Sequence, residues 1–330
     1  MSILVSINCI TYNHENFIED AIVSFLKQQT NFDFEIIIGE DCSTDNTRKI
    51  IEKYVNLYPE KIKLITSEMN IGAEKNLRRI HEKSRGKFIA LCEGDDFWTD
   101  PLKLQKQVEY MEENPECTLC FHNAKVIDSN KTLVRRAVVP WMKNNKKYYL
   151  RKNTKYSAGE LALLGYIPTA SFIYPKHLLD NPPQWCINSV AGDNVIKLIT
   201  SSNGYAYYID EYMSAYRFGV EGSSTTNWVK MNDTQEKKIK LLMRFIKFYE
   251  EFDRYSNYKY KNEIDDVKKI FEFQISVING DWQGKKSRKY YKRILAGLGL
   301  KDKIIIYSRY YFPSVYAKLN KLRIFVLNTK

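Results

Sequence analysis

Phe88-Ile89-Ala90-Leu91-Cys92-Glu93-Gly94-Asp95-Asp96 joins an apolar run to three carboxylates that fall within four residues. The apolar part is typical of a buried strand. Neighbouring carboxylates repel each other, and a hard cation such as Mg²⁺ or Mn²⁺ removes that repulsion. A cation held by one or two carboxylates usually also holds phosphates. A solvated turn after a buried strand explains the same pattern, so the stretch alone leaves both interpretations open.

The rest of the first half repeats such apolar runs, with amphipathic segments between them. The other runs that predict buried parallel strands are 3–9, 34–39 and 62–66. Apolar residues at helical spacing predict helices over 18–29, 50–55, 77–80 and 101–111. The last helix is expected to start at Pro101 with Asp100 as its cap. This alternation predicts an α/β fold with a mostly parallel, Rossmann-like sheet flanked by helices.

Polar residues follow each of the four predicted strands, and two of these segments are doubly acidic. The segments are 10–14, 40–45, 67–72 and 93–96. Parallel sheets bind ligands outside the carboxyl ends of their strands, so the four segments are expected to converge on one rim. Asp95 and Asp96 are the predicted metal and ribose site of this rim, because a cation there would neutralise charge growing on a departing diphosphate.

Two other rim segments carry candidate ligand-binding residues. Asp41 lies at a strand end, where a carboxylate accepts N–H groups from a nucleobase or from the helix start. The nearby Asp45 is interpreted as a helix cap. Asn70 and Gly72 precede a helix that bears Lys75, and glycine lets the backbone approach a ligand while lysine meets a phosphate or a base. An ordinary turn with a solvated lysine is the alternative for this segment.

The second half of the chain is less regular. Residues 118–127 predict a strand and residues 141–155 a basic, aromatic loop. Asp193 follows Gly192 at the start of an apolar helix, far along the chain from the acidic rim. A carboxylate there could take a proton from an attacking hydroxyl, or it could simply cap the helix. Further amphipathic helices are predicted over 230–252 and 263–278.

Composition narrows the function classes. The 330 residues, 44% hydrophobic and 27% charged, are ordinary for one large or two average globular domains. Residues 281–330 hold thirteen Lys or Arg against two Asp, nearly the whole net charge of +12. The remainder is almost neutral, so no nucleic acid partner is expected. The six cysteines predict free thiols in a reducing compartment. Neither a signal peptide nor a spanning apolar segment is evident, which predicts a cytoplasmic protein.

Motifs of competing enzyme classes are absent from the sequence. There is no G-x-x-x-x-G-K-S/T phosphate loop, and no G-x-G-x-x-G follows the first strand. Neither a G-x-S-x-G elbow nor an H-E-x-x-H zinc motif occurs.

Several of these segments, taken together, resemble family 2 glycosyltransferases. The resemblance covers about residues 1–220 and rests on the segments 5–13, 35–47, 70–76, 93–96, 191–193 and 216–217. It implies a GT-A fold, a nucleoside-diphosphate sugar donor, a divalent cation (Mn²⁺ or Mg²⁺) and inversion at the sugar carbon. The nucleotide-sugar half would span about 1–115 and the acceptor half about 116–220. Residues 221–330 would form a helical, basic and aromatic C-terminal extension.

The resemblance also implies roles for individual residues. Those expected to bind the nucleotide sugar are Thr11, Asn13, Asp41, Asn70, Lys75 and Asp95. Asp96 would bind the metal, with Asp95 on the ribose or the metal, and Asp193 would be the general base. Glu40 and Glu93 stand where the family usually has aspartate. No histidine follows Tyr216-Arg217, so a third protein ligand for the metal is not evident, and Glu221 or a water is the suggested substitute.

The basic tail, residues 285–330, mixes Lys and Arg with tyrosine and phenylalanine. This composition suits the anionic face of a membrane, and a helical cap with a solvated basic face is the alternative. Both fit a cytoplasmic enzyme, in the first case one peripheral on the inner face of the cell membrane.

The sequence therefore predicts an inverting glycosyltransferase of surface-polysaccharide synthesis. Its expected partners are a nucleotide-sugar donor, UDP-linked by family expectation, and the hydroxyl of a glycan or lipid-linked acceptor. A nucleotidyltransferase is the alternative enzyme, because it also needs a nucleotide and paired acids. A non-catalytic membrane- or RNA-binding module on a nucleotide-binding fold is the alternative outside enzymes.

Overall fold

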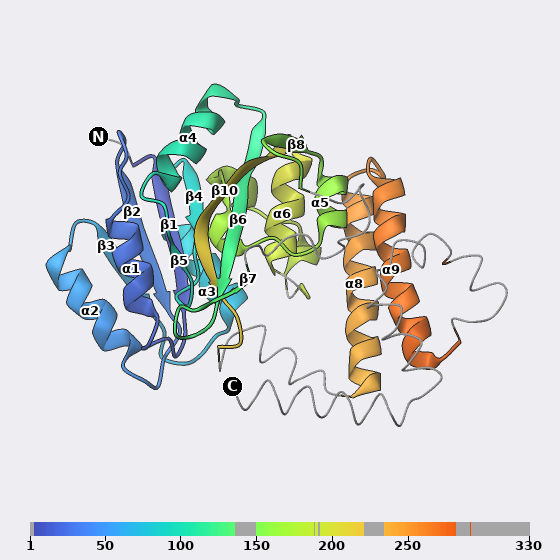
Figure 1. The fold of residues 1–330 in the computed structure, drawn as a ribbon, viewed down its shortest axis with the longest axis horizontal. Helices are drawn as coiled ribbons and strands as arrows, with labels where there is room; N and C mark the ends of the chain where they lie inside the picture. Colours follow the sequence, from blue (N-terminus) through green and yellow to red (C-terminus); the bar gives the residue numbers. More distant parts are fainter. Residues whose placement is uncertain are drawn as a thin grey trace.

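The computed structural model describes residues 3–135, 150–187, 189–190, 192–220, 234–281 and 291. These residues form one mixed β-sheet with helices on both faces, and two long helices stand beside it (Figure 1). Most of the predicted loop at 141–155 lies outside the described residues. The basic tail does too, with the exception of Tyr291.

The sheet places its parallel strands with their carboxyl ends along one edge. In spatial order its strands are β3 (Ile62–Thr66), β2 (Phe34–Glu40), β1 (Val5–Thr11), β4 (Phe88–Leu91), β9 (Ile173–Pro175), β6 (Cys117–Ile127), β10 (Tyr205–Arg217) and β5 (Phe97–Trp98). Strand β1 pairs in parallel with β2 and β4, β2 with β3, and β6 with β10. Strand β9 is antiparallel to both β4 and β6, so β1 to β4, β6 and β10 all point the same way. Two short strands, β7 (Leu133–Arg135) and β8 (Thr154–Tyr156), pair with β6 and β10.

Helices cover the two faces because side chains alternate along the strands. Val5, Ile7 and Cys9 of β1 face one core, whereas Ile89 and Leu91 of β4 face the other. The helices over the first core are α1 (Ile18–Leu26), α2 (Thr47–Leu57) and α4 (Lys103–Glu113). Those over the second are α3 (Ala73–Lys83), α5 (Ala158–Leu164) and α6 (Gly192–Ser202). Short 3₁₀ turns lie at Thr169–Ser171, Lys176–Leu179 and Gln184–Cys186.

The two long helices, α8 (Gln235–Tyr255) and α9 (Lys261–Asn279), pack on α5 and α6 (Figure 1). Their shared core contains Phe248 and Phe252 of α8, Ile264 of α9, Ala162 of α5 and Leu198 of α6. Within the part of the chain that the structure describes, no helix has the length and apolar character needed to cross a bilayer.

The predicted fold class is confirmed, and the differences are local. Residues 101–102 form a turn rather than the first turn of a helix, because Asp100 Oδ1 accepts the Leu102 N–H at 2.8 Å and α4 then starts at Lys103. Strand β10, the longest of the described strands, was not predicted. Register shifts interrupt its pairing with β6, so its burial does not alternate regularly.

Candidate active site

The carboxyl ends of β1, β2 and β4 bring the predicted rim residues together. Thr11 pairs with Glu40 in register, and the Gly94 N–H donates to the carbonyl of Ile10 at 2.9 Å. The Asp41 N–H donates to the carbonyl of Thr11 at 3.1 Å. The segments after the three strands therefore share one edge, as the sequence predicted.

Side-chain hydrogen bonds join the loops after β1 and β2. Asn13 adopts a left-handed backbone (φ 54°), a conformation that asparagine tolerates better than most residues. Its Oδ1 accepts the Thr44 N–H at 2.8 Å, and its own N–H donates to Ser43 Oγ at 3.0 Å. Asp45 accepts N–H groups from Glu15 and Thr47. Burial acts to raise the pKa of Asp45, but these hydrogen bonds prevail and the pKa is lowered.

Asp41 holds the loop that follows β3. Its Oδ1 accepts from the Ile71 N–H at 2.9 Å and from Ser67 Oγ at 3.1 Å, and its Oδ2 accepts from the Gly72 N–H at 2.9 Å. An ionised carboxylate has about four lone-pair sites, so one remains for another donor. Asn70 in this loop and Lys75 in the first turn of α3 are both exposed.

Glu40, the residue that replaces the family's usual aspartate, is buried and paired. Its Oε2 lies 2.6 Å from an Arg48 guanidinium nitrogen, and its Oε1 accepts the Ser43 N–H at 2.5 Å. This glutamate therefore anchors the loop after β2.

Arg217, at the end of β10, fixes the turn that carries Asp95 and Asp96. Its backbone N–H donates to Asp96 Oδ1 at 2.8 Å, and its guanidinium donates to the carbonyl of Asp95 at 2.5 Å and to the carboxylate of Asp20 on α1. The guanidinium is buried between the rings of Phe17 and Phe97. Strand β10 thus orients the acidic pair from the side opposite β1.

Burial and neighbouring acids raise the pKa values of Glu93 and Asp96. Burial, followed by the charges of Asp95 and Asp193, raises the pKa of Glu93 to about 8. Burial and the charges of Asp95 and Glu93 raise the pKa of Asp96 well above its usual value, against the opposing interactions with Arg217. Asp193, in the first turn of α6, therefore faces the end of β4.

Gly94 and His14 lie in two of the segments expected at this rim, but the sequence assigned neither residue a role of its own. A Cβ on Gly94 would lie 2.6 Å from Thr11 Oγ1, so the residue must be glycine for the acidic turn to lie against β1. His14 Nε2 lies 4.0 Å from Asp95 Oδ2, and His14 Nδ1 lies 3.2 Å from Thr11 Oγ1. The only sequence signal for His14 was its position directly after the first strand.

Tyr166 and Lys197 also lie near these acids, and no sequence pattern indicated either residue. The Tyr166 ring lies 5.7 Å from the Tyr216 ring. Burial raises the pKa of Tyr166, and the negative charges of Glu93 and Asp193 act in the same direction, which places the phenol among these acids. Lys197 is buried on α6 and donates from Nζ to the carbonyl of Gly165 at 2.6 Å.

The side chains at the rim fit a hard divalent cation through two carboxylates. Asp96 uses Oδ1 for Arg217 and retains Oδ2, and Asp95 is partly exposed beside it. Among the described residues no group of three or more His, Cys, Asp or Glu side chains is placed to share a metal ion. Mg²⁺ is commonly held by one or two carboxylates together with phosphate oxygens and water, so two protein ligands suffice. Glu221 lies outside the described residues.

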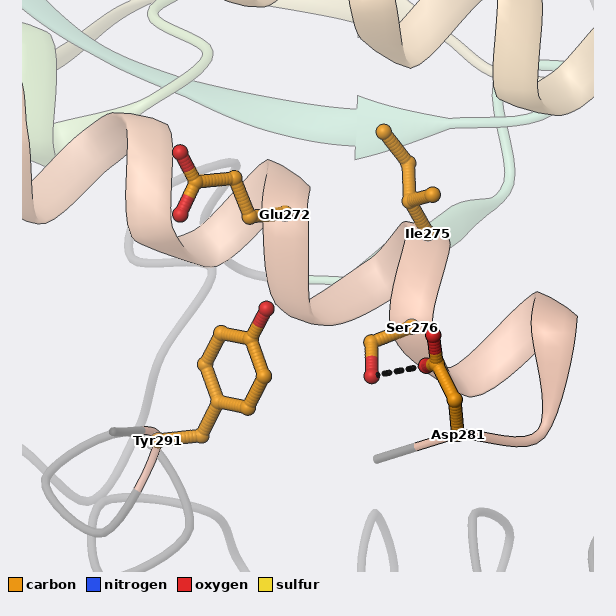
Figure 2. Close-up of a pocket in the computed structure, with 5 residues that line it drawn as sticks. All are labelled: Glu272, Ile275, Ser276, Asp281 and Tyr291. Atoms are coloured by element: carbon orange, nitrogen blue, oxygen red, sulfur yellow. Dashed lines mark hydrogen bonds between the residues drawn. The ribbon is translucent and has the colours of Figure 1, made fainter. Parts of the chain in front are cut away.

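A separate pocket of about 270 Å³ lies on α9 and shares no residue with the rim. Figure 2 shows its lining residues, Glu272, Ile275, Ser276, Asp281 and Tyr291. Ser276 Oγ donates to Asp281 at 2.5 Å, and the Tyr291 hydroxyl points towards the helix.

The part of the chain that contains the rim is similar to a known protein family. Residues 6–165 match the family model described as Glycosyl transferase family 2, a range that includes Asp41 and Asp96 but ends before Asp193. A protein of Mycobacterium tuberculosis without an assigned function is 47% identical over 123 residues, 37% of this chain and 36% of the relative. The UDP-Glc:alpha-D-GlcNAc-diphosphoundecaprenol beta-1,3-glucosyltransferase WfgD of Escherichia coli is 35% identical over 138 residues, 42% of this chain and 51% of WfgD. The chain thus spans about a third to a half of the length of these relatives.

Two solved structures share the fold. The structure of S. aureus TarS 1-349 in complex with UDP-GlcNAc aligns with a TM-score of 0.58 at 18% identity, covering 93% of this chain and 87% of that chain. The mannosyltransferase PcManGT from Pyrobaculum calidifontis in complex with GDP-Man and Mn²⁺ aligns with a TM-score of 0.55 at 13% identity, covering 99% and 86%. The likeness to both concerns the fold, and it confirms the GT-A architecture expected from the sequence.

Proposed function

We propose that this chain, which carries a domain of glycosyl transferase family 2, moves a sugar from a nucleoside-diphosphate donor to a hydroxyl group of a glycan or lipid-linked acceptor in surface-polysaccharide synthesis. The observation that carries the proposal is the convergence of Asp193 with the acids at the end of β4, from far along the chain. A carboxylate that faces a paired-acid site is suitably placed to take the proton of an incoming hydroxyl.

The donor nucleotide would lie over the carboxyl ends of β1, β2 and β4. Thr11 and Asn13 would line its pocket, and Asp41 would offer its remaining lone pair to a base N–H while it holds the loop at 67–72. Asn70 and Lys75, both exposed at this edge, would approach the nucleotide from the other side.

The acceptor hydroxyl would attack the sugar carbon from the side of Asp193 in a single displacement. Asp193 takes the hydroxyl proton, the new glycosidic bond forms, and the bond to the diphosphate breaks with its electron pair leaving on the diphosphate oxygen. Burial raises the pKa of Asp193, which brings the base closer to neutral pH. Asp96 and Asp95 would hold a divalent cation, which when bound neutralises charge on the departing diphosphate.

The donor is proposed to be UDP-linked and the cation to be Mn²⁺ or Mg²⁺. TarS was solved with UDP-GlcNAc and WfgD is named for UDP-Glc, while PcManGT was solved with Mn²⁺. WfgD is also named for a lipid-linked acceptor, which supports a cytoplasmic enzyme working beside a membrane. Contact of residues 285–330 with that membrane belongs to the proposal.

Product analysis tests this function. The purified chain is incubated with UDP- and GDP-sugars, Mn²⁺ and a polyprenyl-diphosphate-linked GlcNAc acceptor. We expect release of a nucleoside diphosphate and a product of inverted anomeric configuration. Asp193→Asn and Asp96→Asn should each lower turnover by about a hundredfold or more, whereas Glu109→Gln, on the exposed side of α4, should not. Release of pyrophosphate would point to a nucleotidyltransferase, and no product with any donor would contradict the proposal.

A further inference from the structure

Lys197 is a buried cation whose surroundings explain why it is there. Its side chain is 2% exposed, and its Nζ donates to the carbonyl of Gly165 at 2.6 Å. A buried ammonium group is costly unless an opposite charge balances it. Asp193, one helical turn earlier on α6, supplies that charge and acts to raise the pKa of Lys197, which burial lowers to about 8.

We propose that Lys197 is a positioning residue of the active site: its charge keeps Asp193 in the ionised form that can accept a proton, and its hydrogen bond to Gly165 fixes Tyr166 beside the acidic cluster. The inference rests on the proposed function in one respect, namely that Asp193 is the base.

Among the groups around Asp193, Lys197 is the one whose charge favours the ionised carboxylate. Asp193 faces Glu93 after β4, Tyr166 after α5 and Tyr249 of α8, and none of these can supply a positive charge. Burial raises the pKa of Asp193, and the charge of Lys197 is the largest effect that lowers it. Loss of this charge should therefore leave Asp193 protonated over a wider pH range.

The second proposed role of Lys197 is to hold the backbone at Gly165 and thereby the position of Tyr166. Helix α5 ends at Gly165, which has a left-handed φ of 75° and sends the chain back towards the rim. Tyr166 follows directly, and its ring lies 5.7 Å from Tyr216, the neighbour of Arg217 in β10. Since Lys197 binds the Gly165 carbonyl, α6 carries both the proposed base, Asp193, and the side chain that holds Tyr166 in place.

The pH profile of turnover tests the first proposed role, that the charge of Lys197 keeps Asp193 ionised. In Lys197→Met we expect the acid limb of kcat/KM to move up by about one pH unit or more, because a nearby opposite charge shifts a carboxyl pKa by about 1–3 units. The loss should be about tenfold or more below the limb and smaller at high pH. Lys197→Arg, which keeps the charge, should restore the position of the limb. Lys103→Met is the matched control, because Lys103 is equally buried on α4, and its acid limb should not move. An unmoved limb in Lys197→Met, with activity lowered equally at every pH, would overturn the proposal.

A measurement without catalysis separates this inference from the proposed function. In protein labelled with ¹³C at lysine Cε, the Lys197 signal should titrate near pH 8, apart from surface lysines, and Asp193→Asn should move it to lower pH. This experiment uses the folded parent and a nearly isosteric variant, so it does not depend on whether Lys197→Met folds. A Lys197 signal unmoved by Asp193→Asn overturns the pairing even if sugar transfer is found. A moved signal without any sugar transfer keeps the pairing and overturns its catalytic meaning.

Discussion

At the scale of single residues, Lys103 is the clearest conflict between burial and charge outside the site. It is fully buried at the start of α4 with its Nζ 4.2 Å from the centre of the Trp98 ring, and no described group accepts a hydrogen bond from it. Burial lowers its pKa to about 7. The folded protein thus favours the neutral amine, whereas the unfolded chain stays protonated up to about pH 10.4.

Lys103→Met should therefore raise the free energy of unfolding, with a definite pH dependence. Below about pH 7 both states carry the proton and the full cost of the buried charge is present, up to about 5 kcal/mol at about 1.4 kcal/mol per pKa unit. Between pH 7 and about 10.4 the folded state has already lost the proton, whereas the unfolded chain still holds it. The cost of the buried charge therefore declines as the pH rises, and the free energy of unfolding of the parent approaches that of the variant. Urea unfolding at pH 6, 8 and 10 measures the gap, and a gap that does not shrink with pH would rule out this origin.

Gly94→Ala should disturb the acidic turn through its Cβ alone. The added atom would meet Thr11 Oγ1 at 2.6 Å, and Gly94 does not have a positive φ, so the effect is steric. Overpacking of this kind costs about 1–3 kcal/mol, and we expect weaker donor binding as the turn leaves β1. Gly192→Ala is the control for stability, since its Cβ would meet nothing within 4 Å, and it should be neutral or slightly stabilising. Thermal unfolding and calorimetric titration with a UDP-sugar measure both effects, and a Gly94→Ala variant as stable as Gly192→Ala would contradict the steric argument.

At the scale of elements, one carboxylate organises the loop between β3 and α3. Asp41→Asn replaces an acceptor oxygen by an amide group, so either Ile71 or Gly72 loses its partner. Hydrogen bonds to charged groups contribute about 1.5–3 kcal/mol, which predicts amide exchange faster by about tenfold or more at whichever of the two positions loses its acceptor. Hydrogen exchange followed by NMR checks this, with the exposed Glu68→Gln in the same loop as control. Unchanged exchange in Asp41→Asn would show that the loop is held by other contacts.

The elements that the sequence predicted are those whose signals are local. Strands such as β4 are continuous apolar runs, and the acids at their ends needed only the rule that parallel strands share an edge. Strand β10 escaped because register shifts break its alternation. Tyr166 and Lys197 could not be predicted for another reason. Their proposed roles depend on Tyr216, Gly165 and Asp193, which the fold brings near them and which no sequence pattern links to them.

At the scale of the whole molecule, helices α8 and α9 pack against α6, the helix that carries Asp193. They bury Phe252 against α5 and α6, and Tyr249 of α8 faces Asp193 itself. Such a shared core predicts that the described part of the chain unfolds in one cooperative transition rather than as a sheet domain with a detachable helical extension.

Phe252→Ala tests this unity. The side chain is fully buried, so its loss should cost about 3–5 kcal/mol and lower the midpoint of the whole transition in differential scanning calorimetry. Met243→Ala lies on the same helix with 60% of the residue exposed, and it should change stability by less than about 0.5 kcal/mol. Two separate transitions, with only one moved by Phe252→Ala, would mean that α8 and α9 fold apart from the sheet. In that case they could not hold α6, and with it Asp193, in place against the acidic rim.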